Sequence, residues 1–290
     1  MTASSPLACV PAASVVTEKP DSLLAAALSH KKESVPAMNT TLFSQFSPAI
    51  RDINTKADSP TLLLGAQGPL SIYYAPFDAL NPQARVVLVG ITPGRTQANN
   101  ALAEARRQLQ DGASAEQALR AAKKTGAFSG AMRSNLVALM DHIGLQRWLG
   151  IGSCEALFGA SGELLHTTSI LPYPVFLNGD NYNGKPDPID NTFLRSVVQE
   201  HFVPQIRALP TAVFVPLGPV ATGVMQRLQD QGVVPARQVL TGLPHPSGAN
   251  AERIQYFLGR KAAAALSTKT DPSKLDAARQ ALSNQVLQLS

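Results

Sequence analysis

The sequence predicts an α/β fold, a three-layer α/β/α sandwich with a central four-stranded, mainly parallel sheet. Runs that we interpret as core strands occur at 85–90, 164–171, 212–217 and 238–243, and the first contains the apolar stretch Val86-Val87-Leu88-Val89 that is typical of a buried strand. Segments with helical periodicity separate these runs, and strands that alternate with helices form right-handed βαβ units around a parallel sheet. A chain of 290 residues, of which 44% are hydrophobic, is long enough to bury a sizeable core.

The N-terminal part of the chain leads into this sheet. Residues 1–37 are rich in Ala, Ser, Pro and Val without a sustained period, so we expect a mobile leader before a single domain at 38–267. A short helix is expected at 42–53. Glycines interrupt the apolar residues at 62–64 and 70–74, which predicts two short strands or a hairpin at the edge of the sheet.

Helices are expected between and after the core strands. Helix propensity and apolar spacing predict them at 101–124 (with a break near Asp111), 132–143, 146–158, 191–208, 219–230 and 251–266. Residues 178–188 are polar and rich in Asn, Gly and Pro, so a loop without regular structure is expected there. Within 268–290, Asp271 is expected to cap an amphipathic helix with Leu275, Ala278, Leu282 and Val286 on one face.

Composition and charge limit the classes of function. No run reaches about eighteen apolar residues, so no membrane partner is expected. Cys9 and Cys154 are too few for a disulfide framework and fit a reducing cytoplasm, and the histidines are too dispersed for a metal site. The net charge of +5 mildly favours a polyanionic partner. Neither a dinucleotide-binding glycine fingerprint nor a phosphate-binding loop is present.

Two turns at strand ends carry the residues best suited to chemistry. The strand at 85–90 ends in residues 90–94 (Gly-Ile-Thr-Pro-Gly), where glycine and proline force a turn. The run at 238–243 leads into residues 245–250 (His-Pro-Ser-Gly-Ala-Asn). In open α/β sheets ligands bind outside the carboxyl ends of the strands, so we expect the two turns to face each other across one pocket.

These turns resemble two motifs of the uracil-DNA glycosylase superfamily. Residues 90–94 are similar to the Gly-Ile-Asn-Pro-Gly and Gly-Met-Asn-Pro-Gly forms of its mismatch-specific and single-strand-selective branches. Residues 245–250 resemble its His-Pro-Ser-x-x-Asn motif, and residues 125–130 (Thr-Gly-Ala-Phe-Ser-Gly) resemble its Thr-Gly-x-Pro-Phe-Gly turn. The resemblance covers about residues 60–267. It implies a monomeric, metal-independent enzyme without a cofactor that cleaves N-glycosidic bonds in DNA.

The resemblance also implies roles for individual residues. His245 is expected to donate a hydrogen bond to the departing base, and Thr92 to position the attacking water. The residues expected to contact the base are Gly90, Ile91, Pro93, Gly94, Phe128 (by stacking) and Ser169. Asn178 is added because the polar, Asn-rich loop at 178–184 carries side chains suited to hydroxyl-rich groups. Those expected to contact DNA are Ser247, Gly248, Asn250 and Arg253. The motifs lack a lysine for Schiff-base chemistry, so a monofunctional enzyme is expected, and Arg106-Arg107 and Lys123-Lys124 are expected to be solvated.

Two departures from the family pattern affect the expected chemistry. The family has Asp or Asn where this chain has Thr92, and a hydroxyl cannot act as an ionised base at neutral pH. The carboxylates considered instead are Asp187, Asp180 and Asp190, with Asp78 a poorer choice. The family reads the base with an Asn on the second core strand, where this chain has Ser169 or Thr168.

Small hydroxyl side chains cannot make the two-point contact that identifies uracil. The sequence therefore predicts a glycosylase for a bulky modified pyrimidine, such as hydroxymethylated or glucosylated cytosine of phage DNA, with a role in anti-phage defence. The alternatives are a uracil or thymine mismatch-repair glycosylase, a catalytically silent DNA-binding damage sensor, and a hydrolase of free nucleosides or nucleotides.

Overall fold

Two β-sheets organise the part of the chain that the computed structural model describes, namely residues 1, 40–125 and 130–289. The parallel sheet has the order β4-β3-β7, with β3 (Val86–Gly90) in the centre between β4 (Leu165–Ser169) and β7 (Val213–Pro216). The antiparallel sheet has the order β1-β2-β5-β6, formed by Leu63–Gln67, Leu70–Tyr73, Val175–Leu177 and Asp180–Asn181. The fold is therefore α/β. The hairpin expected near 62–74 is present as β1 and β2, but it belongs to the antiparallel sheet and does not lie at the edge of the parallel one.

The run at 238–243 does not form a full fourth strand of the parallel sheet. It contributes one parallel bridge, Phe214 to Val239, and one hydrogen bond from Leu240 N to Phe214 O (2.8 Å). Gly242 then adopts a φ of +113°, and a Cβ built there would lie 3.0 Å from the Cβ of Ala278. The chain turns away from β7 at this point to pack against the C-terminal helix.

The helices lie close to their predicted positions. They are α1 (Thr41–Arg51), α2 (Arg95–Gln110), α3 (Ala115–Thr125), α4 (Gly130–His142), α5 (Leu145–Leu149), α6 (Thr192–Val197), α7 (Val203–Arg207), α8 (Pro219–Asp230), α9 (Ala251–Phe257) and α10 (Pro272–Leu287). A π-helical turn joins α6 to α7, and the helix expected at 146–158 is split into α5 and a 3-10 turn at Cys154–Phe158. Helix α9 ends well before residue 266, and Asp271 caps α10 by accepting a hydrogen bond from Lys274 N (3.2 Å).

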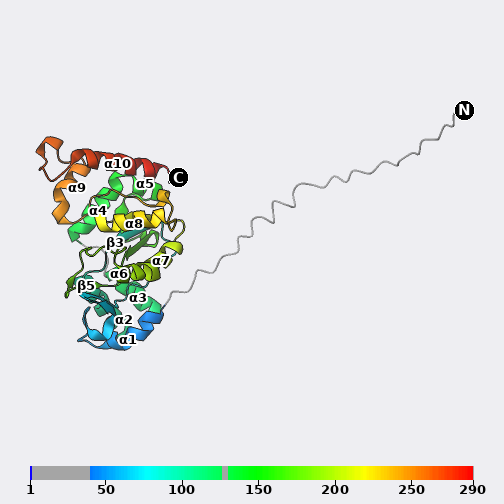
Figure 1. Ribbon diagram of the computed structural model, residues 1–290, viewed down its shortest axis with the longest axis vertical. Coiled ribbons are helices and arrows are strands. Elements are labelled where there is room, and N and C mark those ends of the chain that lie inside the picture. Colours follow the sequence, from blue (N-terminus) through cyan, green and yellow to red (C-terminus); the bar gives the residue numbers. More distant parts are fainter. Residues whose placement is uncertain (2–39, 126–129, 290) are drawn as a thin grey trace. The chain divides into compact units, whose positions relative to one another are not determined.

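Helices cover both faces of the parallel sheet. Alternate residues of β3 point to opposite faces, so Val87 and Val89 join one apolar core while Val86 and Leu88 join another. The first core includes residues of α1, α2 and α3, and the second includes residues of α4, α5, α9 and α10 (Figure 1). This packing fixes β3, and with it the turn that follows Gly90.

Residues Ala37–Ser290 form one compact unit, to which α10 belongs. Leu282 and Val286 of α10 are buried, as the amphipathic pattern predicts. Within 40–125 and 130–289, no helix combines the length and apolar character needed to cross a membrane. The predicted leader at 1–37 lies outside the described residues, apart from Met1.

Candidate functional site

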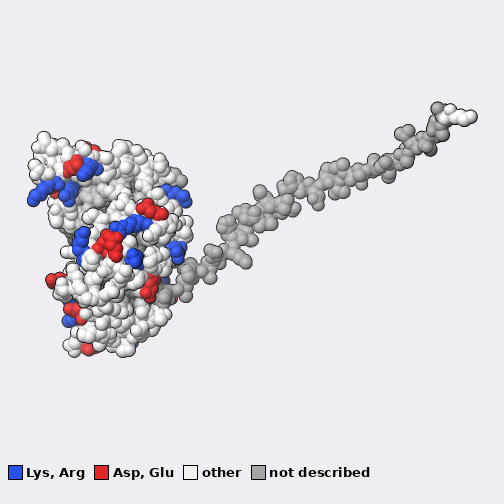
Figure 2. Space-filling view, in the orientation of Figure 1, with Lys and Arg blue, Asp and Glu red and all other residues white. Residues whose placement is uncertain are grey.

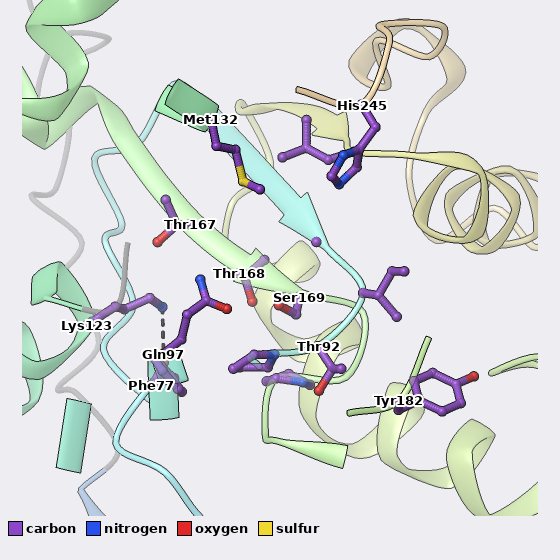
Figure 3. A pocket seen from close by; sticks show the side chains of 15 residues that line it. Phe77, Thr92, Gln97, Lys123, Met132, Thr167, Thr168, Ser169, Tyr182 and His245 are labelled. Carbon is purple, nitrogen blue, oxygen red and sulfur yellow. Dashed lines mark hydrogen bonds between the residues drawn. The ribbon is translucent and has the colours of Figure 1, made fainter. Parts of the chain in front are cut away.

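A cavity of about 300 Å³ lies at the carboxyl ends of β3 and β4, next to the end of β7. Figure 3 shows Lys123, Gln97 and Phe77 toward one side of this pocket, and Thr92, Tyr182 and His245 toward the other. Its lining residues are Phe77, Gly90, Ile91, Thr92, Pro93, Gln97, Lys123, Met132, Thr167, Thr168, Ser169, Pro172, Tyr182, Leu217 and His245. The turn after β3 and the segment around His245 therefore face one pocket, as the sequence predicts.

The register of the parallel sheet brings Ser169 to the turn after β3. Gly90 pairs with Ser169, and a Cβ built on Gly90 would lie 3.4 Å from Ser169 Oγ. Because glycine stands at this position, the Ser169 hydroxyl faces the cavity at the strand end. The neighbouring Thr168 hydroxyl donates to Gln205 Oε1 (2.8 Å). Thr168 and Ser169 are the two residues that could contact the base at this strand end. Because the Thr168 hydroxyl is bonded to Gln205, Ser169 is the better candidate.

Thr92 links the turn after β3 to the segment before β5. Its hydroxyl donates to Tyr173 O (2.8 Å) and accepts from Val175 N (3.2 Å). A hydroxyl has one proton and two lone pairs, so Thr92 has one lone pair left for a water molecule in the pocket. Thr92 can accept a hydrogen bond from that water, but its own proton is already committed to the backbone.

The position of His245 is determined by contacts on three sides. Its Nδ1 accepts a hydrogen bond from Ser247 N (3.3 Å), and Asn135 Nδ2 of α4 donates to the next carbonyl, Pro246 O (2.9 Å). A Cβ built on Gly218, where φ is +87°, would lie 3.1 Å from His245 Cδ2. Glycine at 218 therefore allows the imidazole to approach the N-terminus of α8 closely.

These contacts also select a tautomer of His245. An Nδ1 that accepts from Ser247 N cannot carry a proton, so the neutral ring bears its proton on Nε2. Burial lowers the pKa of His245, which favours the neutral ring at physiological pH. The side chain is therefore arranged as a neutral hydrogen-bond donor.

The residues expected to contact DNA follow His245 in a short hydrogen-bonded series. Ser247 N donates to the histidine, Asn250 Nδ2 donates to Ser247 Oγ (3.2 Å), and Arg253 donates to Asn250 Oδ1 (2.9 Å). Gly248 and Asn250 form a 3-10 turn, and Arg253 lies in α9 and also donates to Lys269 O. The hydrogen bonds of Ser247 and Asn250 thus stabilise the segment 245–250 that carries His245. Gly248 belongs to the same segment, and Arg253 follows it.

Asp187 does not line the pocket. Its Oδ1 accepts hydrogen bonds from Ile189 N (2.8 Å) and Asp190 N (3.3 Å), and it forms an ion pair with Arg227 (3.1 Å). Asp190 pairs with the same arginine, and Asp180 lies in the exposed strand β6. None of the described residues that line the pocket is a carboxylate.

Two residues expected to contact the base have other positions. Asn178 (φ 52°) and Gly179 (φ 83°) form the exposed two-residue turn between β5 and β6, because a type I′ hairpin requires positive φ at both central positions. Gly94 is the N-cap of α2, and its N–H donates to Gln97 Oε1 (3.0 Å). Phe128 lies outside the described residues.

Several lining residues come from segments that carry no recognised motif. Phe77 and Tyr182 supply aromatic rings, and the Tyr182 hydroxyl donates to Pro186 O. Lys123, expected to be solvated, is half-buried in the wall of the pocket, where Nζ donates to Ala79 O (2.6 Å) and Phe77 O (3.1 Å). Arg106, also expected to be solvated, is buried and donates to Ile50 O (2.8 Å).

Lys123 lies near a buried carboxyl group. Asp78 accepts hydrogen bonds from Tyr74 (2.7 Å) and Tyr173 (2.5 Å), and burial raises its pKa while these phenols oppose the rise. Burial lowers the pKa of the Lys123 ammonium to about 7, although the nearby Asp78 opposes this effect. The charge of Lys123 is therefore sensitive to pH near neutrality.

Metal ligands and surface charge add little to the description of the site. Among the described residues, no cluster of three or more His, Cys, Asp or Glu side chains is placed to hold a metal ion. Basic and acidic side chains are interspersed on the face shown in Figure 2. This face therefore presents basic groups to a polyanion only locally, because acidic side chains lie between them.

Comparisons with known proteins identify one relative. No protein-family model and no solved structure matches the chain. The chain is similar to the uncharacterized protein YoxB of Bacillus subtilis (strain 168), with 34% identity over 232 residues, which cover 77% of this chain and 91% of the relative. The chain therefore belongs to the same protein family as YoxB.

Proposed function

We propose that this protein is a monofunctional DNA glycosylase of the uracil-DNA glycosylase type. It extrudes a modified pyrimidine from DNA, hydrolyses its N-glycosidic bond and leaves an abasic site. The observation that supports this most strongly is that His245 and the turn Gly90–Pro93 line one pocket at the carboxyl ends of the parallel strands. These are two of the three segments whose sequences resemble the glycosylase motifs, and the expected α/β/α layering accords with helices on both sheet faces.

The chemistry of base release gives His245 and Thr92 different roles. Cleavage of the C–N bond leaves negative charge on the base and positive charge on the sugar. The Nε2–H of His245 stabilises the carbonyl oxygen of the departing base, and a donor of this kind contributes about 10²–10³-fold in rate. Water then attacks the sugar carbon. Its hydroxyl group stays on the sugar and its proton compensates the charge of the base. The remaining lone pair of Thr92 Oγ1 accepts a hydrogen bond from that water and orients it.

A bulky modified pyrimidine is the proposed substrate. Ser169 stands where the family has an amide that reads uracil, and the pocket walls offer small hydroxyl side chains at Thr167 and Ser169. The released base is hydroxymethylated or glucosylated cytosine of the kind found in phage DNA, and its removal would act in defence against phage.

The second candidate is a DNA-binding damage sensor without activity. It is favoured by the commitment of the Thr92 proton to Tyr173 O and by the lack of a carboxylate among the described lining residues. Single-turnover assays of base release separate the two functions. In a glycosylase, His245→Ala lowers the rate about 10²–10³-fold with DNA binding retained, while His142→Ala, which removes a histidine outside the pocket, has no such effect. Binding without release by the unaltered protein would establish the sensor instead.

A further inference from the structure

A second cavity, of about 550 Å³, adjoins the pocket along the edge strand β4. The two cavities share the side chains of Lys123 and Thr167 in their walls. In the view of Figure 3, these two residues lie on the side of the pocket away from His245 and Tyr182. A ligand that enters past His245 would therefore meet the second cavity at its far end.

The lining of the second cavity combines cations with a carboxylate. Arg120, Lys124 and Arg133 join Lys123 in its wall, together with Gln83 and Glu163. Arg120, in the middle of α3, and Lys124, near its C-terminus, are exposed, and Arg133 lies over the ring of Phe158 at 4.9 Å. Hydroxyl groups both accept and donate hydrogen bonds, so they can use the cations as donors and Glu163 as an acceptor, whereas an anion could use the cations alone.

Lys123 supplies a donor at the junction of the cavities. An ammonium group has three N–H donors, and two of them point to Phe77 O and Ala79 O. The third is available for an acceptor that lies between the cavities. Thr167, on β4, is the other residue that lines both cavities.

We propose that the second cavity binds a hydroxyl-rich glycosyl substituent of the base, which extends from the pocket between Lys123 and Thr167. This inference rests on the proposed function for the placement of the base, and it adds a substituent site with its own residues. The pocket is then open at its far end, so a base with a large polar substituent fits, and the substituent contributes to selectivity.

Equilibrium binding tests the site without relying on catalysis. The probes are duplexes with one 5-hydroxymethylcytosine, with or without glucose on its hydroxyl, or with one 5-carboxycytosine, bound to the His245→Ala protein. We expect the glucosylated duplex to bind more tightly than the other two. Adding Arg120→Ala and Lys124→Ala should reduce this preference by about tenfold. Arg147→Ala with Arg237→Ala, which removes two exposed cations outside both cavities, should leave the preference intact.

A second pair of substitutions tests the passage itself. Thr167→Phe narrows the junction and should abolish the preference for the glucosylated duplex, whereas Thr167→Val keeps the shape of the side chain and should preserve it. The proposal is overturned if both the cation variants and Thr167→Phe keep the full preference, or if the carboxylated base binds most tightly. Lack of base release by the unaltered protein would refute the glycosylase function alone, because the binding preference is measured separately.

Discussion

The hydroxyl of Thr92 donates its proton to the backbone carbonyl of Tyr173 at 2.8 Å. This bond, with the acceptance from Val175 N, ties the turn after β3 to the segment that leads into β5. Thr92 therefore holds one wall of the pocket in place, and any part in orienting water is limited to accepting a hydrogen bond. The site thus differs from one in which an ionised carboxylate activates water at the same position.

Thr92→Val is expected to destabilise the protein. The substitution leaves the buried N–H of Val175 and the carbonyl of Tyr173 without their partner, which costs about 1–3 kcal/mol of the free energy of unfolding. Thr92→Ser keeps the hydroxyl and should stay close to the unaltered protein. Chemical denaturation of the three proteins measures the difference, and equal stability of the Val and Ser variants would contradict this role.

The rate of base release should be insensitive to pH around the ordinary pKa of histidine. Burial lowers the pKa of His245, so the ring gains its second proton only at lower pH than a solvated histidine, about 6.5. Protonation would place a proton on Nδ1 opposite Ser247 N–H and break that bond. We therefore expect a level rate through about pH 6.5, with the fall displaced to lower pH than for a solvated histidine. NMR titration of the ring gives the pKa directly, and a midpoint at or above the ordinary value would contradict the assignment.

Lys123 should make binding of the glycosyl substituent depend on pH. Its pKa is lowered to about 7, so the ammonium is charged below this pH and neutral above it, and its titratable neighbours include Asp78 and His166. The preference for the glucosylated duplex should fall as the pH rises from about 6 to about 8. Lys123→Met should remove this pH dependence of the binding preference. If the preference of this variant still falls over the same pH range, another group is responsible.

The same lowered pKa has a consequence for stability. Between about 7 and the ordinary lysine value, the unfolded chain binds a proton that the folded chain does not, so the contribution of Lys123 to the free energy of unfolding rises with pH. Below about 7 the folded protein bears the cost of burying the charge. Comparing denaturation of Lys123→Met with the unaltered protein across this range isolates the contribution.

Asp187→Asn should leave base release largely intact. The carboxylate lies outside the pocket and is occupied by two backbone N–H groups and Arg227. An asparagine keeps the oxygen that accepts from Ile189 N. Loss of a general base would slow release by about 10²–10⁴-fold, so a rate within about twofold of the unaltered protein excludes that role for Asp187. A loss of the larger size would restore Asp187 as the base.

The sequence predicts much of the fold because the apolar runs and turn residues act locally. Three strands and the facing turns at Gly90 and His245 follow from runs that end in glycine or proline. The fourth predicted strand depends on a tertiary contact, since Gly242 must approach Ala278 of α10, and no local pattern reveals that contact. The polarity of Asn178 suggests contact with the base, but the Asn178-Gly179 pair is itself a hairpin signal, and the structure has the hairpin.

The position of Lys123 in the pocket wall does not follow from its being adjacent to Lys124 in the sequence. Lys123 and Lys124 are adjacent and look like a solvated pair, yet a helix directs neighbouring residues to different sides. The buried Ala118, Leu119 and Ala122 place Lys123 at the edge of the apolar face of α3, one turn after Leu119. The helical spacing of these buried residues is the sequence pattern that indicates the position of Lys123. The carbonyls of Phe77 and Ala79 that receive its protons come from a distant loop, which the sequence alone does not position.

The most direct test of the account is identification of the base released in a single turnover. Duplexes that carry uracil, thymine, 5-hydroxymethylcytosine or its glucosylated form are incubated with excess protein, and the free bases are identified by mass spectrometry. We predict release of the bulky modified cytosine, with little or no release of uracil or thymine, and loss of the product with His245→Ala. Robust release of uracil without release of the bulky bases, or no free base from any duplex, would contradict the account.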